Sequence, residues 1–209
     1  MSAQLILYVD SNFLSPYAMS AFVGLKEKGL AFDMVRLNLA AREQNAGDYA
    51  AQSLTQRVPM LAHGDFKLSE SSAITEYLEE EFAAPQYAAL YPVDKQARAK
   101  ARELQAWLRS DLAAVRQERS TEVVFRQPTD KPLSPQAQAA AAKLFAAGEK
   151  LLANGQEHLL GEWSIADVDF ALMLNRLVLN GDKVPTHLAE YARRQWQRPS
   201  IQDWIALSQ

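Results

Sequence analysis

The sequence predicts a two-domain protein in which an α/β domain is followed by an all-α helical bundle. Strand and helix signals alternate over residues 1–84, whereas residues 92–209 show helical periodicity and no convincing pair of strands. Composition changes at the same place. The residues before position 86 include 11 acids and 6 bases, the later ones include 14 acids and 16 bases, and all four tryptophans are in the later part. Pro85 and Pro92 interrupt any helix between the two parts, which indicates a linker.

The first domain begins with an apolar run at residues 4–10, which suits a strand that is covered on both faces. Ser15-Pro16 opens a helix that runs to Lys28, because a serine cap followed by proline is a typical helix start. A tight hairpin is expected around His63-Gly64-Asp65. We expect strands at residues 4–10, 31–39, 58–62 and 66–68, and helices at residues 15–28 and 70–82. Between the second and third strands, residues 40–56 form a polar segment with at most a short helix.

The second domain is expected to contain helices and loops. Apolar residues recur at helical spacing over residues 97–116, which predicts one long helix. Pro128 and Pro132 indicate that residues 120–134 form a loop. Further helices are predicted at residues 135–152, 164–179, 187–195 and 200–208.

Composition narrows the functional classes. The chain has 209 residues and a formal net charge of −3, with no basic excess of the kind that nucleic-acid binding usually requires. No apolar run approaches the roughly 20 residues needed to cross a bilayer. Residues 1–10 lack the basic region and cleavage site of a signal peptide, so we expect a cytoplasmic protein without membrane partners.

The absence of cysteine is the most restrictive feature of the composition. It excludes disulfides, thiolate metal sites and a cysteine nucleophile, so any thiol chemistry must use a thiol that a ligand supplies. The three histidines are far apart in sequence and form no zinc-binding motif, so no metal is expected.

Four motifs, in order and at matching spacing, resemble those of the cytosolic glutathione S-transferase family: Ser15-Pro16-Tyr17, Val58-Pro59, Glu70-Ser71 and Ser164-x-x-Asp167. The similarity covers essentially the whole chain, and residues 70–74 and 107–112 look like the bacterial YfcF-type branch. It implies a thioredoxin-like domain at 1–84, a helical domain with a second-substrate pocket at 92–209, and glutathione as co-substrate. It further implies a homodimer that transfers glutathione to small hydrophobic electrophiles in detoxification and that also reduces peroxides.

Ser15 is the candidate catalytic residue that the resemblance points to. The ordinary interpretation is a helix cap, whose hydroxyl accepts a main-chain hydrogen bond. The same helix start also favours an anion, so a thiol bound there would be stabilised as its thiolate. Tyr8, Asn12 and Tyr17 remain alternative partners for the sulfur.

The resemblance assigns glutathione binding to Arg57, Val58, Pro59, Glu70 and Ser71. A cis Val58–Pro59 bond would turn the main chain of Val58 outward to pair with the cysteinyl unit, as an added strand would. Ser71 and Glu70 would bind the carboxylate and ammonium groups of the γ-glutamyl end. Arg57 would pair with the glycyl carboxylate. Each assignment has an ordinary structural alternative. Pro59 would be a trans proline at a strand edge, Glu70 and Ser71 would stabilise the start of a helix, and Arg57 would be a solvated loop residue.

In the second domain, Ser164 and Asp167 form a capping-box pattern, for which a structural role is expected. Arg102, Arg109 and Arg116 recur every seven residues, which predicts one charged helix face, ordinarily solvated. By the resemblance, Trp107, Arg109 and Asp111 are candidates for the second-substrate pocket or for a contact across the dimer.

A second functional class stays open at this point. Some proteins of the same fold, such as the stringent starvation proteins that bind RNA polymerase, are interaction modules without catalysis. Retention of Ser15, Val58-Pro59 and Glu70-Ser71 favours the enzyme.

Overall fold

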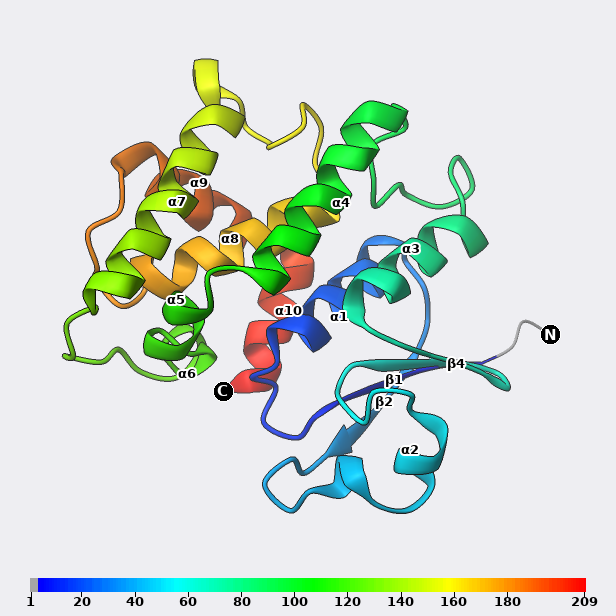
Figure 1. Ribbon diagram of the computed structural model, residues 1–209. Helices are drawn as coiled ribbons and strands as arrows, with labels where there is room; N and C mark the ends of the chain where they lie inside the picture. The colour runs from blue at the N-terminus through cyan, green and yellow to red at the C-terminus, as the bar shows by residue number, and fades with distance from the viewer. Residues whose placement is uncertain (1–3) are drawn as a thin grey trace. The chain divides into compact units, whose positions relative to one another are not determined.

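The computed structural model describes residues 4–209, which form two compact units (Figure 1). Unit 1 contains the residues up to Leu90 together with Asp203–Ser208, and unit 2 contains Tyr91–Gln202. The final helix, α10 (Pro199–Ser208), therefore contributes its carboxyl-terminal half to unit 1. Within residues 4–209, none of the helices has the length and hydrophobicity that a membrane-spanning segment needs.

Unit 1 is built on a four-stranded sheet of strand order β2-β1-β3-β4. The strands are β1 (Leu5–Asp10), β2 (Asp33–Leu37), β3 (Met60–His63) and β4 (Phe66–Ser69). β1 pairs in parallel with β2 and antiparallel with β3, and β3 pairs antiparallel with β4. A parallel pair followed by an antiparallel hairpin confirms the predicted order of strands.

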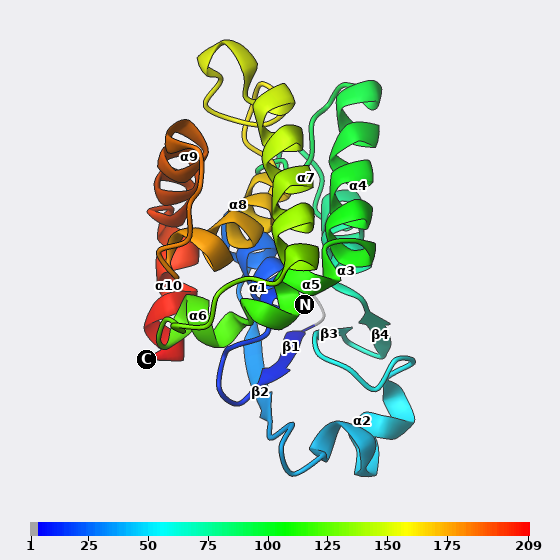
Figure 2. The same cartoon turned by 60° about the vertical axis from the view of Figure 1, so that its left-hand side comes forward.

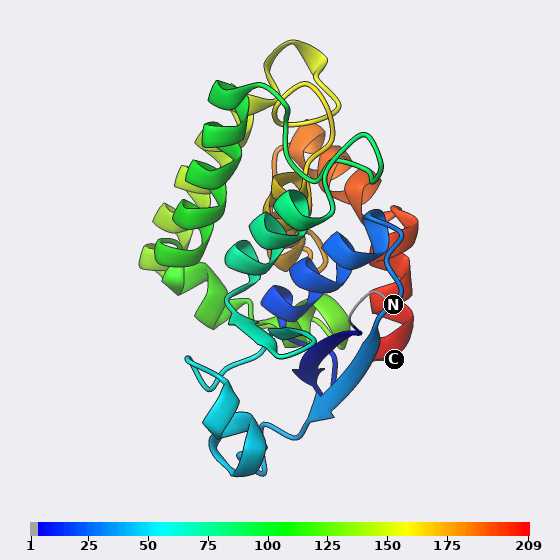
Figure 3. The ribbon, with the colours of Figure 1, turned by 90° about the vertical axis from the view of Figure 1, so that its right-hand side faces the viewer.

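Two helices, α1 (Pro16–Glu27) and α3 (Ser71–Glu81), lie side by side over one face of this sheet (Figure 3). The polar segment that precedes β3 forms a short 3-10 turn, η1 (Glu43–Asn45), and a short helix, α2 (Gly47–Gln52). The segment Asp203–Ser208 adds an aromatic anchor to unit 1. Its fully buried Trp204 ring lies 5.3 Å from the rings of both Phe13 and Phe22.

A buried ion pair in unit 1 joins the end of α1 to α3. The Lys28 ammonium is fully buried and lies 2.7 Å from the Glu79 carboxylate. It also donates to the carbonyls of Phe82 and Ala88, at 2.8 Å each, and Glu79 accepts the amide of Leu90 at 2.9 Å. Three chain segments that are separate in sequence thus meet at one cation.

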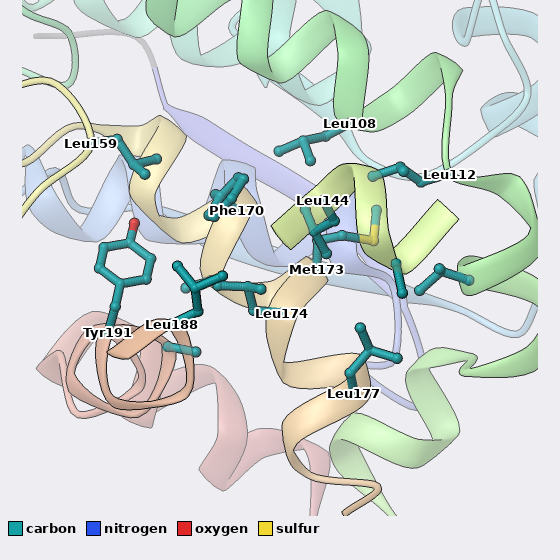
Figure 4. Packing of buried hydrophobic residues seen from close by; sticks show 14 of the residues in the cluster. Leu108, Leu112, Leu144, Leu159, Phe170, Met173, Leu174, Leu177, Leu188 and Tyr191 are labelled. Atoms are coloured by element: carbon teal, nitrogen blue, oxygen red, sulfur yellow. The ribbon is translucent and has the colours of Figure 1, made fainter. Parts of the chain in front are cut away.

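Unit 2 contains helices packed around α8 (Ile165–Val178), which is buried along nearly its whole length (Figure 2). Its core gathers leucines and aromatic rings from several helices, as Figure 4 shows for Leu108, Leu144, Phe170, Leu188 and Tyr191. The other elements are α4 (Lys95–Ser110), α5 (Ala113–Glu118), α6 (Thr121–Phe125), α7 (Pro135–Leu151), η2 (Ala153–Gly155), α9 (Thr186–Trp196) and the first part of α10.

The single long helix expected over residues 97–116 is wrong, because the helix breaks after Ser110. Leu112 takes a left-handed conformation with φ of 60°. The Asp111 carboxylate accepts the Leu112 amide at 2.7 Å and the Trp107 indole at 3.1 Å, and Arg116 donates to the Asp111 carbonyl. These bonds replace the helical ones, so Arg116 belongs to α5 and shares no face of α4 with Arg102 and Arg109.

The loop expected over residues 120–134 is also partly wrong. Residues 121–125 form the helix α6, whose Val123 and Phe125 are buried. The Phe125 ring stacks on Trp196 with the two centroids 6.3 Å apart. The two prolines lie beyond this helix, so within residues 120–134 the irregular part is Ser120 and the residues between α6 and α7.

The predicted capping box at the start of α8 is present. The Asp167 carboxylate accepts hydrogen bonds from the Ser164 amide at 2.9 Å, the Leu159 amide at 3.0 Å and the Tyr191 hydroxyl at 2.8 Å. Burial raises the pKa of Asp167, and the amide bonds oppose that rise. Asp167 therefore joins the preceding loop, α8 and α9.

Replacing Ser164 with alanine is expected to lower the free energy of unfolding by about 1 kcal/mol, the typical value of a helix cap. Denaturation in urea measures this loss. Since Ser164 and Asp167 are buried in unit 2, the folded variant should bind glutathione, the co-substrate that the resemblance implies, as the parent protein does. A variant of normal stability with weaker binding would contradict a structural role for Ser164.

Candidate active site

The loop between β1 and α1 is fixed by a buried carboxylate. Asp10, the last residue of β1, accepts the amides of Leu14 at 2.7 Å and of Ser15 at 3.0 Å. Phe13, which directly precedes Leu14, has a left-handed conformation with φ of 55°, and its side chain is buried. These contacts set the position at which Ser15 begins the helix.

Ser15 is the N-cap of α1, followed by Pro16 in the first turn. Its hydroxyl oxygen accepts the amide of Ala18 at 3.2 Å. A hydroxyl that accepts through its oxygen still has its proton to donate. The half-buried Ser15 side chain can therefore cap the helix and serve as a donor at the same time.

The alternative partners for a sulfur occupy different surroundings. The Tyr8 ring lies 5.3 Å from the ring of Tyr49 and packs against a small buried cluster. Asn12 is exposed in the loop, and Tyr17 is half-buried in the first turn of α1. Asn12 and Tyr17 each interact with other residues of the chain.

The segment before β3 carries the second candidate group. The Val58–Pro59 peptide bond is cis, as predicted. Arg57 is exposed, and its carbonyl accepts a hydrogen bond from the Tyr49 hydroxyl at 2.5 Å. Gln56 has a φ of 51°, so the chain turns sharply just before this segment.

The third candidate group begins α3. Glu70 occupies the N-cap position with φ of 73° and ψ of 118°, and its side chain forms no capping hydrogen bond to the helix. Such a backbone conformation is costly for a residue with a side chain and is concentrated at functional sites. Ser71, the first residue of the helix, is buried. An exposed carboxylate on a strained residue suits ligand binding better than helix capping.

Strand register brings these three segments to one edge of the sheet. Tyr8 of β1 pairs with Met60 of β3, and Met60 pairs with Ser69 of β4. The end of β1, the start of β3 and the end of β4 therefore lie next to one another. Ser15, Val58 and Glu70 extend from these three ends, so their segments meet at this edge.

The candidates in unit 2 are engaged within that unit. Arg109 lies 3.0 Å from the Asp169 carboxylate and donates to the Gln105 carbonyl at 3.0 Å. Asp111 lies 2.6 Å from the Lys143 ammonium. The hydrogen bond from Lys143, with those from Leu112 and the indole of Trp107, lowers the pKa of Asp111 to about 2. Asp111 is thus anionic in its half-exposed position.

Unit 2 contains a cavity of about 1010 Å³ that was not predicted from the sequence. It lies along residues 117–134, with Glu118, Arg119 and Lys131 among its charged residues. Hydrogen bonds from Ser134 lower the pKa of Glu118. The buried Arg119 is held by Asp182 at 2.6 Å. Within residues 4–209, no group of three or more histidine, aspartate or glutamate residues is placed to hold a metal ion.

Two family models match most of the chain. The model described as "Glutathione S-transferase, N-terminal domain" matches residues 3–80, and that described as "Glutathione S-transferase, C-terminal domain" matches residues 94–209. Human glutathione S-transferase theta-1 is 33% identical over 64% of this chain and 55% of its own length. Mouse glutathione S-transferase theta-3 is 34% identical over 48% of this chain and 40% of its own length. The chain thus spans about half the length of the curated relatives it matches.

Solved structures resemble the whole chain. A glutathione transferase homolog from Burkholderia gl BGR1, with bound glutathione, is 46% identical, covers 98% of both chains and has a TM-score of 0.82. A diazinon-metabolizing glutathione S-transferase from the silkworm Bombyx mori shares the fold, with a TM-score of 0.78 at 20% identity. With matches across both of its domains, this chain belongs to the glutathione S-transferase family.

Proposed function

We propose that this protein is a glutathione transferase that binds glutathione as its thiolate and transfers it to small electrophiles. The observation that carries the proposal is the hydrogen bond that the Ser15 hydroxyl oxygen accepts at the start of α1, since this bond leaves the hydroxyl proton available for donation to a ligand. The similar Burkholderia structure, which contains bound glutathione, supports the choice of co-substrate. The absence of cysteine from the chain agrees with a reaction in which the ligand brings the thiol.

The chemistry follows from the charge of the sulfur. The glutathione thiol gives its proton to solvent, and the Ser15 hydroxyl and the first amides of α1 stabilise the thiolate. The thiolate then forms a carbon–sulfur bond. With an organic halide, the halide leaves with its electron pair; with an enone, the α-carbon takes a proton from solvent.

The remaining candidate residues bind the two ends of the tripeptide. Ser71 and the first amides of α3 meet the γ-glutamyl carboxylate, and the strained Glu70 meets the ammonium group. Arg57 meets the glycyl carboxylate. The main chain of Val58 pairs with the cysteinyl unit in the manner of an added strand.

Replacing Glu70 with glutamine is expected to raise KM for glutathione about tenfold, since a charged hydrogen bond contributes about 1.5–3 kcal/mol and this side chain is exposed. KM for the electrophile should change by less than about twofold. Steady-state kinetics with each substrate varied in turn measures both constants. Replacement of the exposed Glu80, on the same helix, serves as the control. Equal increases in the two constants would contradict the role of Glu70.

Peroxide reduction is a related proposal for the same thiolate. Two glutathione molecules and one hydroperoxide would yield glutathione disulfide, an alcohol and water. Because the protein has no cysteine, the second thiol must come from a second glutathione. We further propose a homodimer, with Trp107, Arg109 and Asp111 at the second-substrate pocket or across the interface.

Binding and turnover test the proposed function together. The protein should be retained on a glutathione column and released by free glutathione, and it should conjugate chlorodinitrobenzene. If the protein is not retained and shows no turnover, the proposed enzymatic function is refuted, and a non-catalytic interaction module of the same fold is favoured.

A further inference from the structure

We propose that Tyr49 and Ser53 are positioning residues for glutathione, which hold the Arg57–Pro59 segment and join it to the start of α3. The inference rests on the proposed function, since it concerns how the same site is built. Neither residue belongs to a motif of the sequence, and both lie in the polar stretch around α2.

Tyr49 determines the direction of the peptide unit between Arg57 and Val58. Its hydroxyl donates to the Arg57 carbonyl at 2.5 Å. That peptide unit is trans, because the cis bonds of the described chain are Val58–Pro59 and Ala84–Pro85. In a trans peptide, the C=O and N–H groups point in opposite directions. With the carbonyl held by Tyr49, the Val58 N–H points away from Tyr49.

The Tyr49 side chain is itself firmly placed. It is buried and packs with Leu37 and Met60, and its ring lies 5.3 Å from that of Tyr8. Burial raises the pKa of Tyr49, so its phenol keeps the proton that it donates. A rigid donor of this kind fixes the carbonyl without losing side-chain freedom when the ligand binds.

Ser53 joins the two binding segments. Its buried hydroxyl accepts the Gln56 amide at 3.1 Å and lies 3.2 Å from the hydroxyl of Ser69, which is also buried. Gln56 directly precedes Arg57, and Ser69 directly precedes Glu70. One hydroxyl thus lies between the segment proposed for the cysteinyl and glycyl units and the segment proposed for the γ-glutamyl unit.

These bonds matter because residues 53–59 lie outside any helix or strand. No ladder of main-chain hydrogen bonds holds this segment, so side-chain hydroxyls set its conformation. Glutathione would contact both segments, and its affinity would depend on their separation. Removal of either hydroxyl should therefore weaken glutathione binding while leaving Ser15 in place.

Tyr49→Phe removes the hydroxyl and keeps the ring. We expect its Kd for glutathione, measured by isothermal titration calorimetry, to rise about 3- to 10-fold, the effect of one hydrogen bond. The rate at saturating glutathione and KM for chlorodinitrobenzene should stay within about twofold of wild type. Tyr77→Phe is the matched control, because the Tyr77 hydroxyl bonds His63 at 2.7 Å, away from this segment. It should bind glutathione as wild type does.

Ser53→Ala and Ser69→Ala test the connection between the segments. Each should raise Kd for glutathione, and the double variant should weaken binding little more than Ser53→Ala alone, because both single changes break the contact between the two hydroxyls and only Ser53→Ala also removes the acceptor of the Gln56 amide. Ser53→Thr keeps a hydroxyl and should restore most of the affinity. Thermal unfolding by circular dichroism confirms that each variant is folded before titration.

The outcomes separate the two proposals. Wild-type affinity in folded Tyr49→Phe and Ser53→Ala, with glutathione bound normally by the parent protein, would overturn the positioning role alone. An equal loss of affinity in the Tyr77→Phe control would overturn it as well, because the effect would then lack specificity. No binding by the parent protein would overturn both proposals.

Discussion

Replacing Ser15 with alanine is expected to lower the rate of conjugation at pH 7 by as much as about 25-fold, the value for complete loss of the stabilisation of the thiolate. If the site lowers the pKa of the bound thiol from about 8.5 to about 6.5, the thiolate fraction at pH 7 rises from roughly 3% to roughly 75%. The two pKa units correspond to about 2.7 kcal/mol of preference for the thiolate. Loss of the hydroxyl donor should return the thiol toward its ordinary pKa.

The pH dependence of kcat/KM measures this shift directly. The variant should regain activity at high pH, because the thiolate then forms without help. Ser15→Thr should keep most of the activity, since it retains a hydroxyl. Ser11→Ala, in the same loop, is the matched control. If Ser15→Ala melts at a lower temperature but keeps its activity at neutral pH, Ser15 is only a helix cap.

Replacing Lys28 with methionine is expected to lower the free energy of unfolding by about 3–5 kcal/mol. The change leaves the Glu79 carboxylate buried without its cation, and removal of one partner of a buried ion pair typically has this cost. The carbonyls of Phe82 and Ala88 also lose their donor. For a protein of this size the melting temperature should fall by roughly 10 °C.

Two variants show whether the buried charge causes the loss. Lys28→Met with Glu79→Gln removes both charges and keeps an acceptor for the Leu90 amide, so it should be more stable than Lys28→Met alone. Lys100→Met breaks the exposed pair with Glu103, whose side chains are 64% and 63% exposed, and should change stability by less than about 1 kcal/mol. Similar losses for Lys28→Met and Lys100→Met would contradict this explanation.

Sequence patterns were sufficient for the order of the elements that have local signals. Ser15-Pro16 marks the start of α1, and a capping pattern marks that of α8. The break at Leu112 has no such signal. Leucine fits the apolar spacing of a continuing helix, and the left-handed conformation depends on bonds that Asp111 and Arg116 make in the folded protein.

In the candidate site, too, some features have local sequence signals and others depend on contacts in the folded protein. Motifs and the family resemblance indicate Ser15, Val58-Pro59 and Glu70-Ser71, and strand register accounts for their meeting at one edge. The contacts around them join residues that are distant in sequence. The hydroxyls of Ser53 and Ser69 are 16 positions apart, and Lys28 and Glu79 are 51 positions apart. A lysine at the end of a helix is ordinarily solvated, so nothing in the sequence indicates its burial.

The packing of Trp204 on Phe13 and Phe22 has a consequence for biosynthesis. The ribosome completes the sheet and its two covering helices first, but the tryptophan emerges only after residues 91–202 have been made. Until then, the rings of Phe13 and Phe22 lack the indole that packs on them, and Phe13 belongs to the loop that leads to Ser15. A premature stop codon before position 204 would remove this aromatic packing and leave the loop to the hydrogen bonds that Asp10 accepts.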